Sequence, residues 1–392
     1  MMPADYRESE PERYLALDSL RGVAACLVVF FHLPSSGYIW DNPIVKNGFL
    51  AVPFFFVLSG FVMGVTYGNR FSKAYSLIRY MALRAGRLYP LHLFIIGCIF
   101  VWELVRLAGN LPAHREGVPF AGNTNLADLP LNLLMLQHFA DPSSWNKPSW
   151  SIGAEWWTYL AFALLAGFAG FRGKLHLTAA TLIVPYLVLR IGDFDIGPGW
   201  RSMFDCMMNF GAGLLIFELR KAALVQSMAD RIGRSAASII EGLALAFALL
   251  MMAWFGSRLS PLITPAFALV ILVFSYERGV ISRMLTVGPL LVLGSLSYSI
   301  YMIHQFVLDR LLELVAEIAN EWGLPLLPNE TGRLVLVGDR LACDLLILAM
   351  LCLVIALSWF TYRHIEMPAR KWSRQIIGSG KRADAGASAA TF

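Results

Sequence analysis

The segment from Leu17 to Pro34 holds two side chains that could do chemistry in otherwise apolar surroundings. Arg21 and His32 are eleven positions apart, and the ten residues between them are small or apolar. In a helix this spacing is three turns and a small remainder, so both side chains project from one face, roughly 16 Å apart along the axis. Pro34 is expected to end the helix just after the histidine.

An ionisable side chain inside a membrane span is costly unless it faces a partner or a water-filled cavity. The placement of Arg21 and His32 on one face therefore indicates a functional site. The alternative interpretation is that Arg21 extends its charge to the cytosolic interface and that His32 lies at the opposite interface.

Two further arginines, Arg84 and Arg87, precede the sequence Leu-Tyr-Pro at the start of another apolar segment. Residues three apart share a helix face, so the two guanidinium groups could bind one phosphate group together. Each arginine taken alone is explained more simply as a positive charge on the cytosolic side of a membrane.

Glu155 follows Ser149-Trp150-Ser151, where a polar loop enters an apolar segment. A carboxylate just inside such a segment needs a partner, and we interpret Glu155 as a group that handles a proton. Tryptophans nearby are typical of an aromatic belt at the membrane interface. They are Trp145, Trp150, Trp156 and Trp157.

The run from Leu293 to His304 makes one apolar segment unusually polar, with serines and tyrosines between its ends. For the serines, hydrogen bonds to neighbouring helices are the favoured interpretation. His304 is expected in the outer half of its segment, as His32 is. A last polar run, Tyr362 to Pro368, is interpreted as a salt bridge or a helix stop.

The composition is that of a membrane protein. The chain has 392 residues, of which 57% are hydrophobic and 15% are charged, and its mean hydropathy is +0.59. Soluble domains are less apolar and more highly charged. The basic residues cluster in short loops, which excludes nucleic acid as the expected partner and favours membrane lipids. The five cysteines have no metal-like spacing, so neither a metal site nor a disulfide is expected.

We predict an all-α polytopic protein with about ten transmembrane helices. They are expected near 17–34, 48–67, 88–107, 151–170, 176–191, 203–217, 236–255, 261–276, 285–309 and 341–362. The implied cytosolic segments hold 21 Lys and Arg residues and the outer ones hold 10, with Arg21 left aside. This asymmetry predicts that both termini are cytosolic.

Residues 1–16 are predicted to form a cytosolic segment and not a cleaved signal peptide. Residues 17–374 form the transmembrane domain, and residues 375–392 form a disordered cytosolic tail that is rich in Gly, Ser and Ala. The connection at 68–87 is expected to be a basic cytosolic loop. The region 108–148 is expected to be a long outer loop, in which residues 129–139 are interfacial or re-entrant.

This topology places His32, Glu155 and His304 toward the outer side and Arg21, Arg84 and Arg87 toward the cytosol. Such a site suits an elongated, negatively charged cytosolic donor. An acyl-CoA has that shape, since its phosphates would bind the arginines and its pantetheine arm would bring the thioester near His32.

Taken together, these motifs resemble the acyltransferase 3 family, whose members include bacterial O-acetylases of lipopolysaccharide and exopolysaccharide. The resemblance rests on six features in order. They are Arg21 with His32, Phe54 to Phe61, Arg84-x-x-Arg87-Leu-Tyr-Pro, Ser149-Trp150-Ser151 with Glu155, Ser297-Tyr298-Ser299-Ile300-Tyr301 with His304, and Glu366-x-Pro368. It covers about residues 14–374.

The resemblance implies ten core helices, a bacterial inner-membrane location, an acyl-CoA donor, and essential roles for His32 and Arg21. It also implies that Arg84 and Arg87 contribute to donor binding. Some members carry an additional extracytoplasmic hydrolase-like domain, for which this sequence has no room.

The expected activity is O-acylation, with acetyl as the expected group, of a carbohydrate or glycolipid. His32 would act as a general base, with Glu155 or His304 orienting it or relaying the proton. Direct transfer and a covalent acyl-histidine both remain open. The alternatives are acylation of a sugar on a small natural product such as a macrolide, and a transporter of acyl groups or lipid-linked sugars. The oligomeric state stays open.

Overall fold

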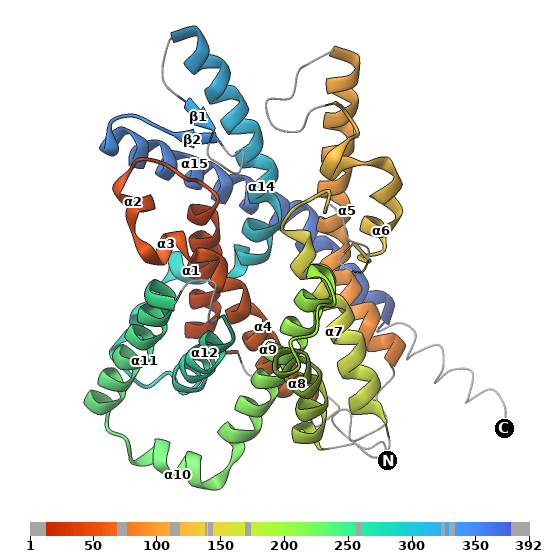
Figure 1. Cartoon of the computed structure of the whole chain (residues 1–392). Coiled ribbons are helices and arrows are strands. Elements are labelled where there is room, and N and C mark those ends of the chain that lie inside the picture. The colour runs from red at the N-terminus through yellow and green to blue at the C-terminus, as the bar shows by residue number, and fades with distance from the viewer. Residues whose placement is uncertain are drawn as a thin grey trace, which may run out of the picture.

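The computed structural model of this chain describes residues 13–68, 77–109, 118–137, 139, 144–168, 174–255, 260–322, 326–328 and 334–377. Over these residues the fold is helical, apart from one antiparallel pair of short strands, β1 (Leu326–Pro328) and β2 (Leu334–Leu336) (Figure 1). Each of the ten segments predicted to span the membrane coincides with a helix. These helices are α1 (Leu15–Phe31), α4 (Ala51–Tyr67), α5 (Leu77–Gly109), α7 (Ser149–Gly167), α8 (Leu175–Ile191), α9 (Pro198–Lys221), α11 (Arg234–Phe255), α12 (Ser260–Phe274), α14 (Gly288–Trp322) and α15 (Arg340–Thr361).

Within the described ranges, six helical runs are both long and apolar enough to cross a membrane. They are Gly48–Tyr67, Leu77–Gly109, Pro198–Lys221, Arg234–Trp254, Gly288–Val315 and Arg340–Ile377. Large apolar side chains such as Val101, Leu104, Ile239 and Leu243 are exposed on their outer faces, as expected where lipid replaces water. The chain is therefore an all-α, multi-pass membrane protein. The crossing of all ten helices and the cytosolic location of both termini stay predictions.

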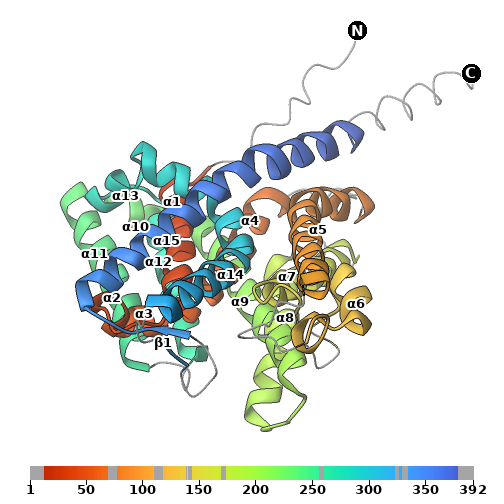
Figure 2. The ribbon, with the colours of Figure 1, turned by 90° about the horizontal axis from the view of Figure 1, so that it is seen from above.

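The shorter elements gather at the two ends of the bundle. At one end lie α2 (Tyr38–Asp41), α3 (Pro43–Lys46), α6 (Leu129–Leu133) and the strand pair, whereas α10 (Ala223–Arg231) lies at the other (Figure 1). The remaining short helix is α13 (Val280–Leu285). Viewed from above, α4 and α14 lie between one group made of α1, α11, α12 and α15 and another made of α5, α7 and α8 (Figure 2).

Small residues allow the central helices to approach closely. A Cβ atom added at Gly22 of α1 would lie 2.5 Å from the backbone nitrogen of Gly294 in α14. Likewise, a Cβ at Gly60 of α4 would lie 1.9 Å from the carbonyl oxygen of Phe210 in α9. Contacts through small residues are typical of helix pairs in membranes, where packing replaces the hydrophobic effect. Both crossings fix helices that carry polar side chains into the interior.

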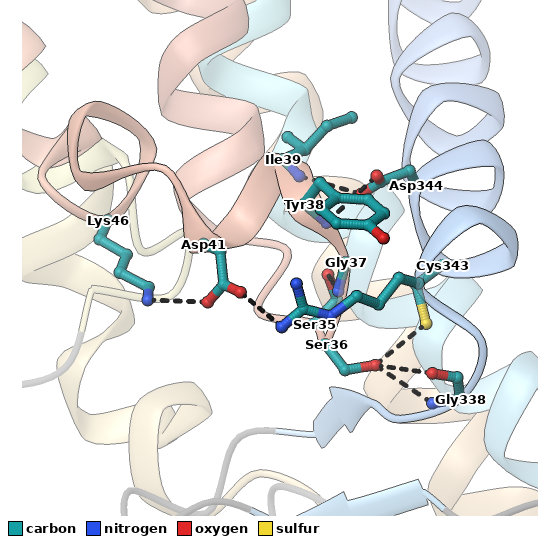
Figure 3. A network of polar contacts seen from close by, with 11 residues as sticks. Ser35, Ser36, Gly37, Tyr38, Ile39, Asp41, Lys46, Gly338, Cys343 and Asp344 are labelled. Atoms are coloured by element: carbon teal, nitrogen blue, oxygen red, sulfur yellow. Dashed lines mark hydrogen bonds and ion pairs between the residues drawn. The ribbon is translucent and has the colours of Figure 1, made fainter.

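Figure 3 shows a polar network, which we call the latch, that ties the segment after α1 to the start of α15. The Asp344 carboxylate accepts hydrogen bonds from the backbone N–H groups of Tyr38 and Ile39, both at 3.1 Å. The Ser36 hydroxyl donates to the carbonyl oxygen of Gly338 at 3.1 Å. The latch joins parts of the chain that are about 300 positions apart, and it holds the segment that directly follows His32.

A group of ion pairs around Asp41 extends the latch. The Asp41 carboxylate accepts from Lys46 at 3.2 Å and from Arg340 at 2.9 Å. These ion pairs are exposed, so each contributes little to stability.

Three predicted boundaries are corrected by the structure. The third apolar segment begins earlier than expected, because α5 starts at Leu77 and includes Arg84 and Arg87; residues 69–76 of the predicted basic loop lie outside the described residues. Pro368 does not stop the last helix, because α15 runs through a π-helical turn (η6, Tyr362–Glu366) and the helix continues to Ile377. The helix thus includes residues 375–377 of the predicted tail, and residues 378–392 lie outside the described residues.

In the predicted outer loop, the 129–139 stretch contains the five-residue helix α6, preceded by two short 3₁₀ turns, η3 (Gly122–Thr124) and η4 (Leu126–Asp128). A third 3₁₀ turn, η1 (Gly48–Leu50), leads into α4. Trp145 is buried against the protein and its indole N–H donates to the carbonyl oxygen of Asn125 at 2.9 Å. This tryptophan therefore belongs to the protein interior and not to a lipid-facing belt.

Candidate active site

One cavity collects side chains from α1, α4, α5, α7 and α14. Its polar members include Arg21, Ser59, Arg87, Glu155 and Tyr298. Three of the six predicted site residues, Arg21, Arg87 and Glu155, thus line a single space. We call it the arginine cavity.

Arg21 is held by α14 and by its own helix. Its Nε donates to the Ser297 hydroxyl at 2.8 Å, and its Nη2 donates to the Gly294 carbonyl at 3.0 Å. The Asp18 carboxylate lies 3.5 Å from the same Nη2. These contacts are possible because Gly22 lets α1 approach Gly294. Arg21 is therefore anchored inside the bundle and does not extend to an interface.

The two arginines of α5 have different surroundings, although three positions separate them. Arg87 lines the arginine cavity. Arg84 instead lies over the rings of Tyr67, Tyr80 and Tyr159, with its guanidinium carbon 5.6, 5.9 and 5.7 Å from their centroids. Its Nη2 donates to the Tyr67 hydroxyl at 3.3 Å. Cation–π contacts of this kind stabilise a buried positive charge.

Glu155 lies in a triangle of close polar contacts at the wall of the cavity. Its Oε1 accepts from the Ser59 hydroxyl at 2.6 Å and from the Tyr159 hydroxyl at 2.5 Å, and the two hydroxyls are 2.7 Å apart. Accepting two hydroxyl donors at one oxygen is what an ionised carboxylate does well. Arg21 and Arg87 share the same cavity, so a carboxylate faces two cations across it.

The polar run on α14 makes the interhelical contacts predicted for it. Ser299 donates to Glu366 at 3.0 Å, and the Tyr298 hydroxyl donates to the Leu88 carbonyl at 2.6 Å. Tyr301 and Ser151 share a hydrogen bond at 2.7 Å. Glu366 also pairs with Arg370 at 3.2 Å, which confirms the salt-bridge interpretation of the last polar run.

His32 and His304 lie beside each other, with ring centroids 4.9 Å apart. His32 caps the C-terminus of α1, so Pro34 follows the end of the helix as predicted. The Nδ1 of His32 is 2.8 Å from the Val28 carbonyl oxygen, and the Nδ1 of His304 is 2.7 Å from the Tyr301 carbonyl oxygen. A carbonyl only accepts, so a neutral ring in either place carries its proton on Nδ1 and its lone pair on Nε2.

Tyr301 connects the two features. Its side chain lines the arginine cavity, and its ring centroid is 5.8 Å from that of His304. His304 is completely buried, and its Nε2 has no hydrogen-bond partner among the described residues. The histidine pair therefore lies next to the cavity, and within the described residues the Nε2 of His304 is a candidate for proton transfer.

Sequence reasoning missed the tyrosines that hold Arg84 and Glu155. Tyr80 precedes Arg84 by four positions, and Tyr159 follows Glu155 by four, so both relations could have been found from helical spacing. Tyr67 could not, because it comes from α4. Within the described part of the chain, no three His, Cys, Asp or Glu side chains group as a metal site would require, and the five cysteines are free.

Comparison with known proteins agrees on one family. Residues 14–363 match a family described as an acyltransferase domain, a range that includes all six predicted site residues. Protein 2 in the picA locus of Rhizobium radiobacter is 29% identical over 194 residues, which are 47% of this chain and 96% of that protein. The BcsY protein of Komagataeibacter xylinus is 24% identical over 298 residues, which are 74% of this chain and 71% of that protein.

The O-acetyltransferase OatA of Staphylococcus aureus is 25% identical over 312 residues, which are 74% of this chain and 50% of OatA. The match therefore spans half of that relative's length. No solved structure matches the chain.

Proposed function

The chain belongs to this acyltransferase family, and with that premise we propose that it transfers an acyl group from acyl-CoA to a hydroxyl of a carbohydrate. Acetyl is the expected group, because OatA is named as an O-acetyltransferase. The expected acceptor is an exopolysaccharide, a lipopolysaccharide or a related glycan. The proposed location is the bacterial inner membrane, with the donor entering from the cytosol.

The arginine cavity is the proposed donor site. Arg21 and Arg87 line it and would bind the phosphate groups of the donor, since guanidinium groups bind phosphate through paired hydrogen bonds. Arg84 would support that site indirectly: it fixes Tyr159, whose hydroxyl bonds Glu155 at the cavity wall.

The histidine pair is the proposed site of proton transfer. The Nε2 of His32 would remove the proton of the acceptor hydroxyl while the oxygen attacks the thioester carbonyl carbon. The carbon–sulfur bond then breaks, and the CoA thiolate takes up the proton from the His32 imidazolium. His304, whose ring lies beside His32, would orient it, and Glu155 would serve as a second proton-handling group in the cavity.

The single observation that carries this proposal is the convergence of Arg21, Arg87 and Glu155 on one cavity that adjoins the pair of His32 and His304. A transporter of lipid-linked sugars has no need for such a histidine pair. A covalent acyl-histidine at His32 is a second chemical route, in which Nε2 attacks the thioester first and the acceptor hydroxyl then attacks the acyl-imidazole.

The test is transfer of label by purified protein in lipid nanodiscs. With acetyl-CoA labelled in the acetyl group and de-O-acetylated polysaccharide from the producing strain, we expect alkali-labile label on the polysaccharide and release of the CoA thiol. A transporter would leave acetyl-CoA intact. Label on a co-supplied macrolide and not on the polysaccharide would favour the natural-product acceptor. Label that remains on the protein and is removed by hydroxylamine would favour the acyl-histidine.

A further inference from the structure

The last helix is longer than a membrane crossing requires. From Arg340 to Ile377 it is one helical run of 38 residues, whereas about 20 residues cross the hydrocarbon layer of a bilayer. Residues 345–360 hold no charged side chain, and four Lys and Arg residues follow them before Ile377. We call residues 367–377, which come after the π-helical turn, the terminal helix. It begins where the apolar part of the chain has ended.

Two contacts fix the terminal helix to the bundle. A Cβ atom added at Gly86 of α5 would lie 2.3 Å from the side chain of Ser373, so the two helices touch there. Arg370 donates to Glu366 at 3.2 Å, and Glu366 also accepts from Ser299 of α14 at 3.0 Å. Figure 1 and Figure 2 both show the end of α15 beside the start of α5. The face that carries Ser373 therefore points toward the protein, and this fixes the direction of the other faces.

The remaining surface of the terminal helix divides into two sides. At about 100° per residue, basic residues lie at roughly 60° to 160° on one side of Ser373, and apolar residues lie at roughly 60° to 140° on the other. The basic side consists of Arg370, Lys371 and Arg374, and the apolar side consists of Pro368, Trp372 and Ile376. Trp372 is 66% exposed and Ile376 is 49% exposed, and Lys371 and Arg374 are exposed as well.

The basic side and the apolar side next to it together indicate the ligand. Among the described residues, neither Lys371 nor Arg374 has an ion-pair partner, and residues 367–377 contain no Asp or Glu. Both cations therefore suit an anion. A soluble anion would leave Trp372 and Ile376 in water, whereas a phospholipid supplies a phosphate and acyl chains together. Tryptophan is enriched where these two parts of a lipid meet, and Lys or Arg next to a membrane span attracts anionic lipids.

We propose that the terminal helix is a binding site for anionic phospholipids. Lys371 and Arg374 bind the headgroup phosphates, and Trp372 and Ile376 lie among the upper parts of the acyl chains. This goes beyond the general attraction of basic loops to a membrane, because the contact lies on one helix whose orientation is fixed by α5 and α14. The inference does not depend on the proposed acyl transfer, because none of these four residues lines the arginine cavity.

The test measures lipid selectivity of the full-length protein purified in detergent. Phosphatidylglycerol and phosphatidylcholine are added in equal amounts, and native mass spectrometry counts the lipids that stay bound. The variant combines Lys371→Gln with Arg374→Gln. The matched control combines Arg231→Gln with Arg234→Gln, because these arginines are also exposed and have the same spacing, but lie where α10 meets α11.

One Lys or Arg near an anionic membrane surface contributes about a fivefold preference. We therefore expect the ratio of bound phosphatidylglycerol to phosphatidylcholine to fall about 5- to 25-fold in the variant and to stay within about twofold of the parent in the control. An equal fall in both proteins would indicate a general effect of charge and overturn the inference, and so would an unchanged ratio in the variant.

A competition arm separates lipid from soluble phosphate. Coenzyme A, added at the same phosphate concentration as the anionic lipid, should leave the bound-lipid ratio of the parent unchanged. Displacement of phosphatidylglycerol by coenzyme A in the parent, but not in the Lys371→Gln, Arg374→Gln variant, would assign these two cations to a soluble ligand and overturn the proposal.

A second measurement tests the apolar side. The chain has 11 tryptophans, so the difference between the emission spectra of the parent and of Trp372→Phe isolates the emission of Trp372. In nanodiscs whose lipid is brominated near the top of the acyl chains, we expect most of this emission to be lost. Emission that the bromine leaves unchanged and that aqueous iodide quenches would place Trp372 in water and overturn the inference.

Discussion

The arginine cavity and the histidine pair are built differently. In the cavity, polar side chains from different helices hold one another: Arg21 donates to Ser297 of α14, and Glu155 of α7 accepts from Ser59 of α4. At the histidine pair, by contrast, each Nδ1 is bonded to a carbonyl of its own helix. The cavity is thus preorganised to hold charge by contacts between helices, whereas each histidine is oriented by a carbonyl of its own helix.

The first prediction concerns the histidine pair. Changing His32 to Ala should lower acetyl transfer by about 10²–10⁴-fold, which is the usual contribution of a general base. Binding of acetyl-CoA should be retained, because His32 does not line the arginine cavity. His176→Ala is the matched control, since that histidine is exposed at the start of α8. Near-normal transfer in a well-folded His32→Ala protein would contradict the mechanism.

The second prediction separates the two arginines of α5. Arg87→Ala should raise the donor KM by about 10- to 100-fold, because a charged hydrogen bond to phosphate is lost, with little change in thermal stability. Arg87→Lys should recover only part of this affinity, because lysine lacks the paired geometry.

Arg84→Ala should show the opposite balance, with a smaller change in donor KM and a larger fall in melting temperature. The reason is that three tyrosine rings lose the cation they surround. Isothermal titration with CoA and thermal unfolding measure the two effects. Equal donor affinity in the parent and both alanine variants would remove these arginines from the donor site.

The third prediction concerns the support behind His32. Asp344→Ala leaves two backbone N–H groups of the latch without an acceptor, so we expect the free energy of unfolding to fall by about 1–3 kcal/mol. Transfer should fall a few-fold while the donor KM stays constant, because the latch fixes the segment after His32 and not the cavity. Asp344→Asn keeps one oxygen acceptor, so its free energy of unfolding and its transfer rate should lie between those of Asp344→Ala and the parent. A change in donor KM without a change in transfer would contradict the assignment of the latch to the histidine segment.

The smallest effect is expected at Asp41, where the ion pairs are exposed. Lys46, and then Arg340, hold the pKa of this carboxyl below its usual value of 3.8. A lowered pKa means that the contribution to stability is present at neutral pH and is lost as pH falls through that lowered pKa. Asp41→Asn should therefore lower the melting temperature slightly at pH 7, and the difference from the parent should shrink as the solution is acidified below pH 3.8. A difference that grows in acid would contradict this assignment.

The sequence was informative wherever helical spacing alone decided the outcome. It predicted the all-α membrane class, the end of α1 before Pro34, and the interhelical bonds of Ser297 and Ser299. It failed where the partner comes from elsewhere in the chain. Arg84 and Arg87 share a helix face, yet Tyr67 of α4 draws Arg84 into a cluster of tyrosines.

The placement of Glu155 shows the same limit. From the sequence we grouped Glu155 with the two histidines, because all three residues were expected toward the outer side. In the structure Glu155 lines the cavity with Arg21 and Arg87, whereas His304 is the residue beside His32. The latch had no local signal, because its partners are about 300 residues apart.

Two contacts between α1 and α14 fix the position of one helix along the other. Gly22 packs against Gly294 beside Arg21, and His32 lies against His304 at the other end, so the two helices cannot slide past each other. The distance from the arginine to the histidine is then set at roughly 16 Å by the helical rise. A donor bound by its phosphates must carry its thioester on an arm of that length. A truncated thioester, such as S-acetyl-N-acetylcysteamine, or the compact acetyl phosphate would satisfy one end only, so donor choice would follow molecular length as much as the identity of the acyl group.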